Sequence, residues 1–422
     1  MDFPRAAGVL VHPTSFPSRY GIGDLGSSAY HLIDFLVSGR QSLWQILPLG
    51  PTSYGDSPYQ SFSAFAGNPL LISPDKLVEE GYLPSEEIAE VPAFPVDKVD
   101  YGWVIDYKGK LLRRAYEQFQ QYGHDDQRGA FEFFKAEQAY WLDDFALFMA
   151  LKIYHIDQDG GVWNTWPYDI AYRKPEAIAW WSAHLADDVH FHKFLQYLFF
   201  KQWLELKRYA NERGIQVVGD IPIFVAFDSA DVWANPELFS LHEDGSPMVV
   251  AGVPPDYFSE TGQLWGHPLY RWELMAEDGY RWWIDRFRMA FTQADVVRID
   301  HFRGFYNYWE VPAGETTAIK GRWLRGPGAS LFHAVTGALG EVAIIAEDLG
   351  DFDDESRAGV DALQKAFGYP GMKVLQFAFG AGPVDPFLPH NYTTTDWVAY
   401  TGTHDNDTVL GWYQETLSLI QI

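Results

Sequence analysis

The sequence predicts an α/β protein, a (β/α)8 TIM-type barrel with helical insertion subdomains and without its last βα unit. Short runs rich in Val, Ile and Leu recur along the chain, and such near-continuous apolar runs are typical of parallel strands buried on both faces. Helix-like segments lie between several of these runs, as in a barrel or a doubly wound sheet. Polar or charged residues end most of the runs. This favours the barrel, because barrel enzymes build their sites at the carboxyl ends of the strands.

Seven strands are expected, at residues 8–12, 44–48, 215–220, 295–300, 342–347, 373–378 and 397–402. Two helices between the later strands carry end signals. The segment 330–340 begins with a Ser that can cap it and ends in Gly, and the segment 356–367 is followed by Gly368. Only 20 residues follow Gly402, which leaves room for about one helix. We therefore expect an incomplete barrel that exposes two strand edges.

The spacing of the strands divides the chain into three parts. Residues 1–50 carry the first two barrel strands, and residues 51–214 form a mostly helical insertion subdomain, because this stretch is far longer than one crossover connection. Residues 215–422 carry strands three to seven, with a lid-like insertion at about 228–293. The part of this insertion from Gly252 to Gly262 has Gly and Pro near both ends, which predicts a surface loop.

Composition excludes several classes of function. The chain has 57 acidic residues against 31 Lys and Arg, a net charge of −26, so binding to nucleic acid or to an anionic membrane is not expected. The absence of cysteine excludes disulfides, thiolate nucleophiles and Cys-ligated metal sites, and it fits a cytoplasmic location. No apolar run reaches the length of a membrane-spanning helix, and the amino-terminal residues do not have the pattern of a signal peptide.

Carboxylates end three of the expected strands. Arg298 and Asp300 are two residues apart and so share one face of a strand. A guanidinium beside a carboxylate favours the ionised form that a nucleophile needs, although a structural ion pair has the same pattern. Glu347 follows an apolar strand, where its pKa can rise enough for a general acid, or where it can cap a helix. Asp405, next to His404, is a third carboxylate, in a turn or a metal site if taken alone.

The three carboxylates converge on one mouth if the barrel is correct. Two carboxyl groups about 5–5.5 Å apart are the arrangement of a retaining glycosidase. Around them, several motifs resemble those of amylomaltases, the 4-α-glucanotransferases of glycoside hydrolase family 77. The resemblance extends from Gly8 to about Trp412. The motifs that carry it are residues 57–65, 219–222, 253–258, 262–266, 298–301, 346–350 and 404–406.

The resemblance implies a role for each residue that matches a motif. It makes Asp300 the nucleophile, Glu347 the acid/base, and Asp405 the carboxylate that holds the 2- and 3-hydroxyls of the sugar in the transition state. The residues that it implies for substrate binding are Tyr59, Asp220, Arg298 and His404 at the cleavage point, Gln263 and Trp265 on the acceptor side, and Tyr54 in a second glucan site. No cofactor and no metal are implied.

The expected activity is the transfer of α-1,4-glucan segments to the 4-hydroxyl of an acceptor glucan or of glucose. The expected partners are α-1,4-glucans, maltooligosaccharides and glucose, with no obligatory protein partner. Two alternatives share the same residues: an α-glucan hydrolase of the same clan, and an inactive glucan-binding fragment. A barrel metallohydrolase that uses His12, His301 and His404 is a third alternative.

Overall fold

The computed structural model describes residues 4–156, 161–256, 259–380 and 382–417. Seven parallel strands follow one another around the barrel in chain order. Five of them form one sheet in the order β1 (Gly8–Leu10), β2 (Leu43–Gln45), β3 (Gln216–Pro222), β6 (Val296–Asp300) and β9 (Ile344–Ala346). The other two, β10 (Gly371–Val374) and β11 (Trp397–Tyr400), pair with each other.

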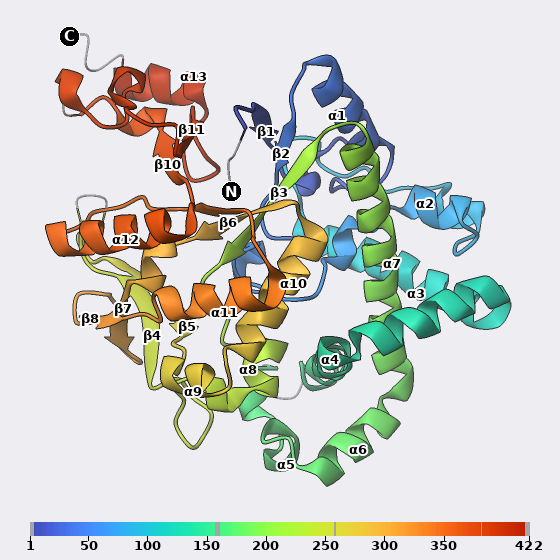
Figure 1. Ribbon diagram of the computed structural model, residues 1–422. Helices are drawn as coiled ribbons and strands as arrows, with labels where there is room; N and C mark the ends of the chain where they lie inside the picture. The colour runs from blue at the N-terminus through green and yellow to red at the C-terminus, as the bar shows by residue number, and fades with distance from the viewer. Residues whose placement is uncertain (1–3, 157–160, 257–258, 381, 418–422) are drawn as a thin grey trace.

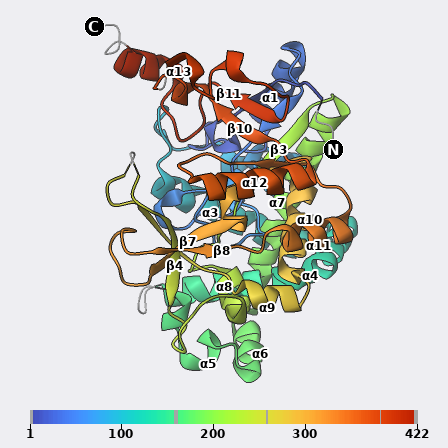
Figure 2. The ribbon, with the colours of Figure 1, turned by 60° about the vertical axis from the view of Figure 1, so that its left-hand side comes forward.

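The two sheets are continuous at one edge. The backbone N–H of Ala346 in β9 donates to the carbonyl of Pro370, just before β10, at 2.9 Å. Across the barrel, the Tyr400 hydroxyl in β11 donates to Gln45 Oε1 in β2 at 2.7 Å. Figures 1 and 2 show the red strands β10 and β11 beside the blue amino-terminal part of the chain. The α/β barrel class predicted from the sequence is confirmed, with seven parallel strands among the described residues.

The observed strands overlap the expected ones but differ from them by one to four residues at their ends, and the difference is clearest for β10. The apolar run at 373–378 predicted a strand there, but β10 covers Gly371–Val374 and a 3-10 turn follows at Leu375–Phe377. The pairing decides this, because Gly371 lies opposite Trp397 and Val374 lies opposite Tyr400, so the ladder stops where β11 stops. Hydrophobicity continues beyond the last residue that has a partner strand.

The register of the strands stacks the barrel interior in layers. Val218 of β3 lies opposite Val296 of β6, and both pack with Ala343, Ile345 and Met372 in an apolar cluster. Two residues further along the same strands, Asp220 lies opposite Arg298. Because side chains alternate along a strand, these two residues are on the same side as the two valines, toward the carboxyl ends of the strands. The apolar layer therefore supports a polar layer at the barrel mouth.

The helices surround this barrel. Their bounds are α1 (Ser27–Ser38), α2 (Pro74–Glu79), α3 (Tyr101–Tyr122), α4 (Asp125–His155), α5 (Tyr168–Ala171), α6 (Pro175–His184), α7 (Ala186–Glu212), α8 (Ala230–Ala234), α9 (Trp272–Glu277), α10 (Arg281–Gln293), α11 (Ala329–Leu339), α12 (Asp354–Phe367) and α13 (Val409–Trp412). The two helices expected before β9 and β10 are confirmed as α11 and α12. Gly368 ends α12 with a φ of 68°, in the left-handed region that favours glycine.

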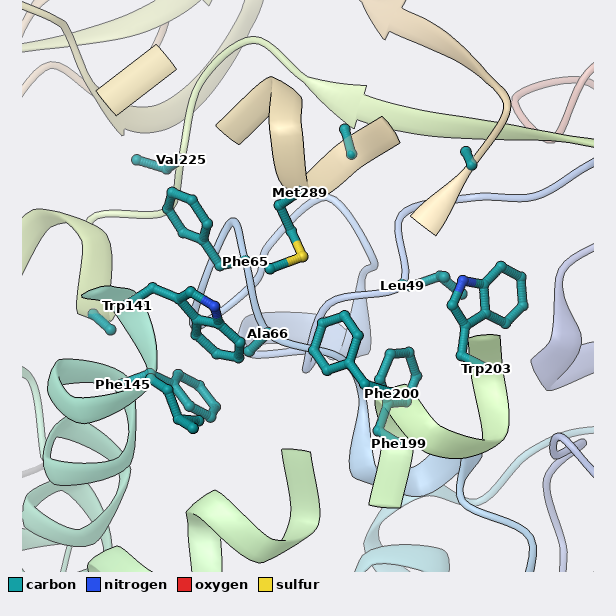
Figure 3. Packing of buried hydrophobic residues seen from close by; sticks show 14 of the residues in the cluster. Leu49, Phe65, Ala66, Trp141, Phe145, Phe199, Phe200, Trp203, Val225 and Met289 are labelled. Atoms are coloured by element: carbon teal, nitrogen blue, oxygen red, sulfur yellow. The ribbon is translucent and has the colours of Figure 1, made fainter. Parts of the chain in front are cut away.

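Long helices between β2 and β3 share an apolar core with the barrel. Figure 3 shows Trp141 of α4 and Phe200 of α7 in one cluster with Phe65, from the segment after β2, and Met289 of α10. The ring centroids of Trp141 are 6.4 Å from those of Phe65 and 5.9 Å from those of Phe200. This packing fixes the segment after β2 against the barrel. The division of the chain into domains stays a prediction.

A second sheet lies beside the barrel, and the loop expected at 252–262 connects two of its strands. Its four antiparallel strands have the order β5 (Gln263–Pro268), β4 (Val249–Val253), β7 (Asn307–Pro312) and β8 (Arg322–Arg325). Gly252 is part of β4, and the connection to β5 is shorter than expected; residues 257–258 of it lie outside the described residues. Figure 2 shows β4, β7 and β8 together. The sequence did not indicate this sheet, because β7 pairs with β4 from about 60 residues away.

No helix among the described residues is long and apolar enough to cross a membrane.

Candidate active site

A buried guanidinium links two carboxylates at the barrel mouth. Arg298 of β6 is 3% exposed. Its Nη1 donates to Asp220 Oδ2 at 2.7 Å, and its Nη2 donates to Asp300 Oδ1 at 2.9 Å. Burial alone would lower the pKa of Arg298, but the two carboxylates raise it well above its ordinary value. The guanidinium therefore stays charged and favours the ionised form of Asp300.

Asp220 is more deeply buried than Asp300. Its side chain has no exposed surface, whereas that of Asp300 is 31% exposed. Burial raises the pKa of Asp220, and the charge of Asp300 raises it further, while Arg298 opposes both. Its Oδ2 also accepts a hydrogen bond from the Tyr59 hydroxyl at 2.8 Å, and its Oδ1 is buried without a partner among the described residues. Asp300 is thus the carboxylate of this pair that a substrate can reach.

Tyr59 connects the loop after β2 to the loop after β11. Its ring stacks on that of His404, with centroids 5.3 Å apart and an angle of 12° between the planes. The Tyr59 oxygen and His404 Nε2 are 2.8 Å apart. Because Tyr59 uses its proton toward Asp220, His404 Nε2 carries the proton in their hydrogen bond. Burial lowers the pKa of His404, so its ring is neutral at neutral pH.

Asp405 lies at the outer side of this cluster. Its Oδ1 is 3.3 Å from His404 Nε2, and its side chain is 70% exposed. Its backbone N–H donates to Thr403 Oγ1 at 3.3 Å, within a turn that Asn406 also closes. The contacts therefore form one chain, which leads from Asp300 through Arg298, Asp220, Tyr59 and His404 to Asp405.

Glu347 approaches Asp300 from the neighbouring strand β9. Its Oε2 accepts a hydrogen bond from the backbone N–H of His301 at 2.7 Å, and its Oε1 accepts one from the N–H of Leu349 at 2.9 Å. His301 has a φ of 54°, which is rare for a residue other than glycine, and this conformation goes with the N–H directed at Glu347. Burial and the charge of Asp300 raise the pKa of Glu347 to about 7. A carboxyl group with this pKa can hold a proton at neutral pH and release it.

The acceptor-side residues predicted from the sequence reach the site through His301. The ring of Trp265 on β5 meets the ring of His301 edge to face, with centroids 4.9 Å apart. Trp265 Nε1 in turn donates to Gln263 Oε1 at 3.2 Å, and Gln263 is exposed. The small antiparallel sheet therefore carries both residues to the Glu347 side of the mouth.

Tyr54 is the one predicted site residue that the structure places apart from this cluster. It lies in the 3-10 turn Tyr54–Asp56 and is 88% exposed. Within the described residues, no side-chain hydrogen bond or ring contact joins Tyr54 to the cluster at the mouth.

Sequence reasoning missed the residues that hold the loops of the site in position. Arg303 donates from Nε to Asn307 Oδ1 at 3.0 Å and from Nη1 to the carbonyl of Asp351 at 2.5 Å, so it joins the segment after Asp300 to the segment after Glu347. Asp348 accepts from the Met372 N–H at 2.9 Å and joins β9 to β10. The motif at 346–350 contains Asp348, but only the fold shows what it binds.

The histidines of the metallohydrolase alternative are already engaged in other contacts. His12 Nδ1 accepts a hydrogen bond from the Leu47 N–H at 3.3 Å, His404 Nε2 is bonded to Tyr59, and His301 packs against Trp265. These contacts orient the three rings without a metal ion.

Comparisons with known proteins show which family the chain belongs to. The model of glycoside hydrolase family 77, described as 4-alpha-glucanotransferase, matches residues 11–420. A 4-alpha-glucanotransferase of Thermus thermophilus is 52% identical over 98% of this chain and 81% of the relative. The chloroplastic/amyloplastic 4-alpha-glucanotransferase of Solanum tuberosum is 43% identical over 97% of this chain and 70% of the relative.

Among solved structures, the amylomaltase from Streptococcus agalactiae in complex with acarbose is similar, with a TM-score of 0.91 and 42% identity. The similarity covers 97% of this chain and 81% of that one. Both the sequence and the fold lead to the same conclusion: the chain belongs to the 4-alpha-glucanotransferases of glycoside hydrolase family 77.

Proposed function

We propose that Asp300 and Glu347 are the nucleophile and the acid/base of a retaining double displacement in this 4-α-glucanotransferase. The enzyme transfers segments of α-1,4-glucan from a donor to an acceptor. The observation that carries the assignment is the guanidinium of Arg298, which binds Asp220 and the more exposed Asp300 at once. The raised pKa of Glu347 supports its role as the partner that supplies a proton.

In the first step, Asp300 attacks the anomeric carbon of the donor while the bond from that carbon to the glycosidic oxygen breaks. Glu347 gives its proton to the departing oxygen, and a β-glycosyl ester of Asp300 forms. In the second step, the 4-hydroxyl of an acceptor attacks the same carbon and releases Asp300. Glu347, now a carboxylate, takes the hydroxyl proton, and two inversions restore the α configuration.

The remaining residues bind substrate in this proposal. Asp405 holds the 2- and 3-hydroxyls of the sugar at the cleavage point, and Tyr59 and His404 contact the same unit. Asp220 and Arg298 belong to this binding group through their hydrogen bonds with Tyr59 and Asp300. Gln263 and Trp265 bind the acceptor. Tyr54, which is exposed on the surface, belongs to a second glucan site that affects long chains more than short ones.

We extend the proposal to substrates and location. Donors are α-1,4-glucans and maltooligosaccharides, and glucose is both an acceptor and a product. The enzyme acts without an obligatory protein partner, and the cysteine-free composition supports a cytoplasmic location.

Incubation with maltotriose tests the function. We expect free glucose and a ladder of longer oligosaccharides, with the total number of reducing ends constant. Reducing ends that rise without a ladder would identify a hydrolase instead. Binding of amylose without any product would identify an inactive glucan-binding protein. The variants Asp300→Asn and Glu347→Gln, compared with the surface variant Asp106→Asn, assign the chemistry to the two proposed residues.

A further inference from the structure

His267 is a buried imidazole with no assigned role. It lies near the end of β5 and is 8% exposed, and its Nε2 is buried without a hydrogen-bond partner among the described residues. Within the described part of the chain, Nδ1 has no hydrogen bond either. A neutral imidazole has one donor and one acceptor to satisfy, and buried polar groups of native proteins nearly always find partners.

A bulge in β5 brings this ring to the site. Gly252 of β4 lies opposite Leu264, but Val250, two residues away, lies opposite Pro268, four residues further along β5. Gly266 takes a φ of 76° inside this irregularity. Bulges redirect side chains and occur often beside active sites. On one side of the bulge Trp265 contacts His301, and on the other side His267 lies within electrostatic reach of Asp300.

The charge state of His267 suits a sugar hydroxyl. Burial lowers the pKa of His267 to about 4, against the opposing effect of Asp300, and the nearby Arg286 lowers it further. The imidazole ring of His267 is therefore neutral in the folded enzyme at neutral pH. A hydroxyl group both donates and accepts a hydrogen bond, so it matches a neutral imidazole in either tautomer.

Two other buried histidines show why the position matters. His155 and His192 also have a buried Nε2 without a partner among the described residues. His155 packs between Trp166 and Trp181, and the charges near His192 are those of Asp188 and Arg113, on the helices α7 and α3. Neither has a carboxylate of the proposed site as a neighbour, and both are explained by packing in the helical region.

We propose that His267 hydrogen-bonds a hydroxyl group of the donor glucose unit that becomes attached to Asp300, so that the glucan supplies the partner that the ring lacks in the free protein. This inference rests on the proposed role of Asp300. It makes His267 a substrate-binding residue that acts in the donor half of the reaction. Acceptor binding, assigned to Gln263 and Trp265, does not depend on it.

The kinetics of three variants with maltotriose test whether the side chain of His267 contributes to cleavage of the donor. His267→Leu lowers kcat/KM for the donor about tenfold, as expected for the loss of one hydrogen bond in the transition state. His267→Asn keeps a neutral donor and acceptor and retains most of the activity. The KM for glucose as acceptor is unchanged in both. His192→Leu, the matched control, changes the melting temperature only. Equal losses in the Leu and Asn variants, or a loss no greater than that of His192→Leu, would overturn the proposal.

Deoxygenated donors separate binding from structure. α-Glucosyl fluorides that lack the 2-, 3- or 6-hydroxyl are compared in the wild type and in His267→Leu, as a double-mutant cycle. For one of the three donors, removal of the hydroxyl is expected to lower kcat/KM by a factor about tenfold smaller in the variant than in the wild type. If removal of each hydroxyl lowers the rate by the same factor in the wild type and in His267→Leu, His267 has only an internal water as its partner and the proposal fails. A failure of the Asp300 assignment is distinct, because Asp300→Asn would then retain activity.

Discussion

Two arginines of the barrel are equally buried and have opposite properties. Arg298, at the mouth, is 3% exposed, and Arg286 of α10, behind the strands, is 2% exposed. Arg298 donates to two carboxylates. Arg286 donates to the carbonyls of Ile223 and Pro222, at 2.9 and 2.5 Å. The pKa of Arg298 is raised well above the ordinary value, whereas burial lowers the pKa of Arg286.

The comparison shows that burial alone does not mark a functional charge. The carbonyls of Ile223 and Pro222 accept hydrogen bonds from Nη1 and Nη2 of Arg286, while its Nε is buried without a partner among the described residues. These bonds fix the end of β3 to α10, which is a structural role. Arg298 and its two carboxylates form a compact group of opposite charges at the barrel mouth. A substrate can displace water there and reach Asp300. The hydrogen-bond partners of a buried arginine decide whether its role is structural or chemical. Five substitutions test this difference, at Asp300, Arg298, Arg286, Glu347 and Tyr59.

Asp300→Asn has the largest expected effect. It removes the nucleophile and one of the two charges that distinguish Arg298 from Arg286, so transfer from maltotriose falls by about 10⁴-fold or more. The fold remains, because Arg298 keeps Asp220 as its partner. Initial rates of glucose release and the melting temperature check this, with Asp106→Asn as the control. A variant with a tenth of the wild-type rate would show that another group is the nucleophile.

Replacing each arginine by lysine tests the comparison itself. Lysine cannot make two hydrogen bonds in the fixed fork geometry of a guanidinium. Arg298→Lys therefore lowers kcat by about 10²-fold or more with the melting temperature little changed. Arg286→Lys lowers the free energy of unfolding by about 1–3 kcal/mol, and kcat per folded molecule stays within about threefold. Circular dichroism melts and active-site-normalised rates separate the two. Equal losses of kcat in the two variants would show that the two arginines do not differ in their roles.

The acid/base role of Glu347 predicts a pH dependence. Because the pKa of Glu347 is raised to about 7, kcat/KM for maltotriose falls about tenfold per unit above that pH, as the proton needed for donor cleavage is lost. The folded form binds this proton more tightly than the unfolded chain does. Its contribution to stability is therefore full below pH about 4.5 and is lost as the pH rises through about 7.

Glu347→Gln removes this titration. Urea unfolding at about pH 5 and about pH 8 should show a larger loss of stability in the wild type than in the variant. If stability falls equally in both proteins between these two pH values, Glu347 has the ordinary pKa of a glutamate.

Tyr59→Phe has the smallest expected effect. It removes the hydroxyl that links Asp220 to His404 but keeps the ring that stacks on His404. The hydrogen bonds of this hydroxyl to Asp220 and with His404 are both lost, which lowers kcat/KM by about tenfold. Tyr82→Phe, which removes a buried hydroxyl 3.3 Å from that of Tyr197 in the helical region, is the matched control. A larger loss in the control would show that the effect is on folding.

Much of the barrel was accessible from the sequence because its signals are local. Apolar runs predicted all seven parallel strands, and Gly368 marked the end of α12 correctly. The pair Arg298 and Asp300 could be assigned to one face because two residues is the period of a strand. The antiparallel sheet was missed, because its strands β4 and β7 are separated by α9, α10 and β6, and pairing at that distance leaves no local pattern.

The order of the strands, the carboxylates at their ends and the family resemblance that implies their roles can all be read from the amino-acid sequence. The folded structure was needed to show that Tyr59, Asp220 and His404 meet and that Glu347 is held by the backbone of His301. It was also needed to show that His267 lies near Asp300 with its Nε2 unpartnered among the described residues. The physical reason is one of range. Periodicity and helix ends follow from the sterics of neighbouring residues, whereas burial, pKa and hydrogen-bond partners depend on residues that approach only when the chain is folded.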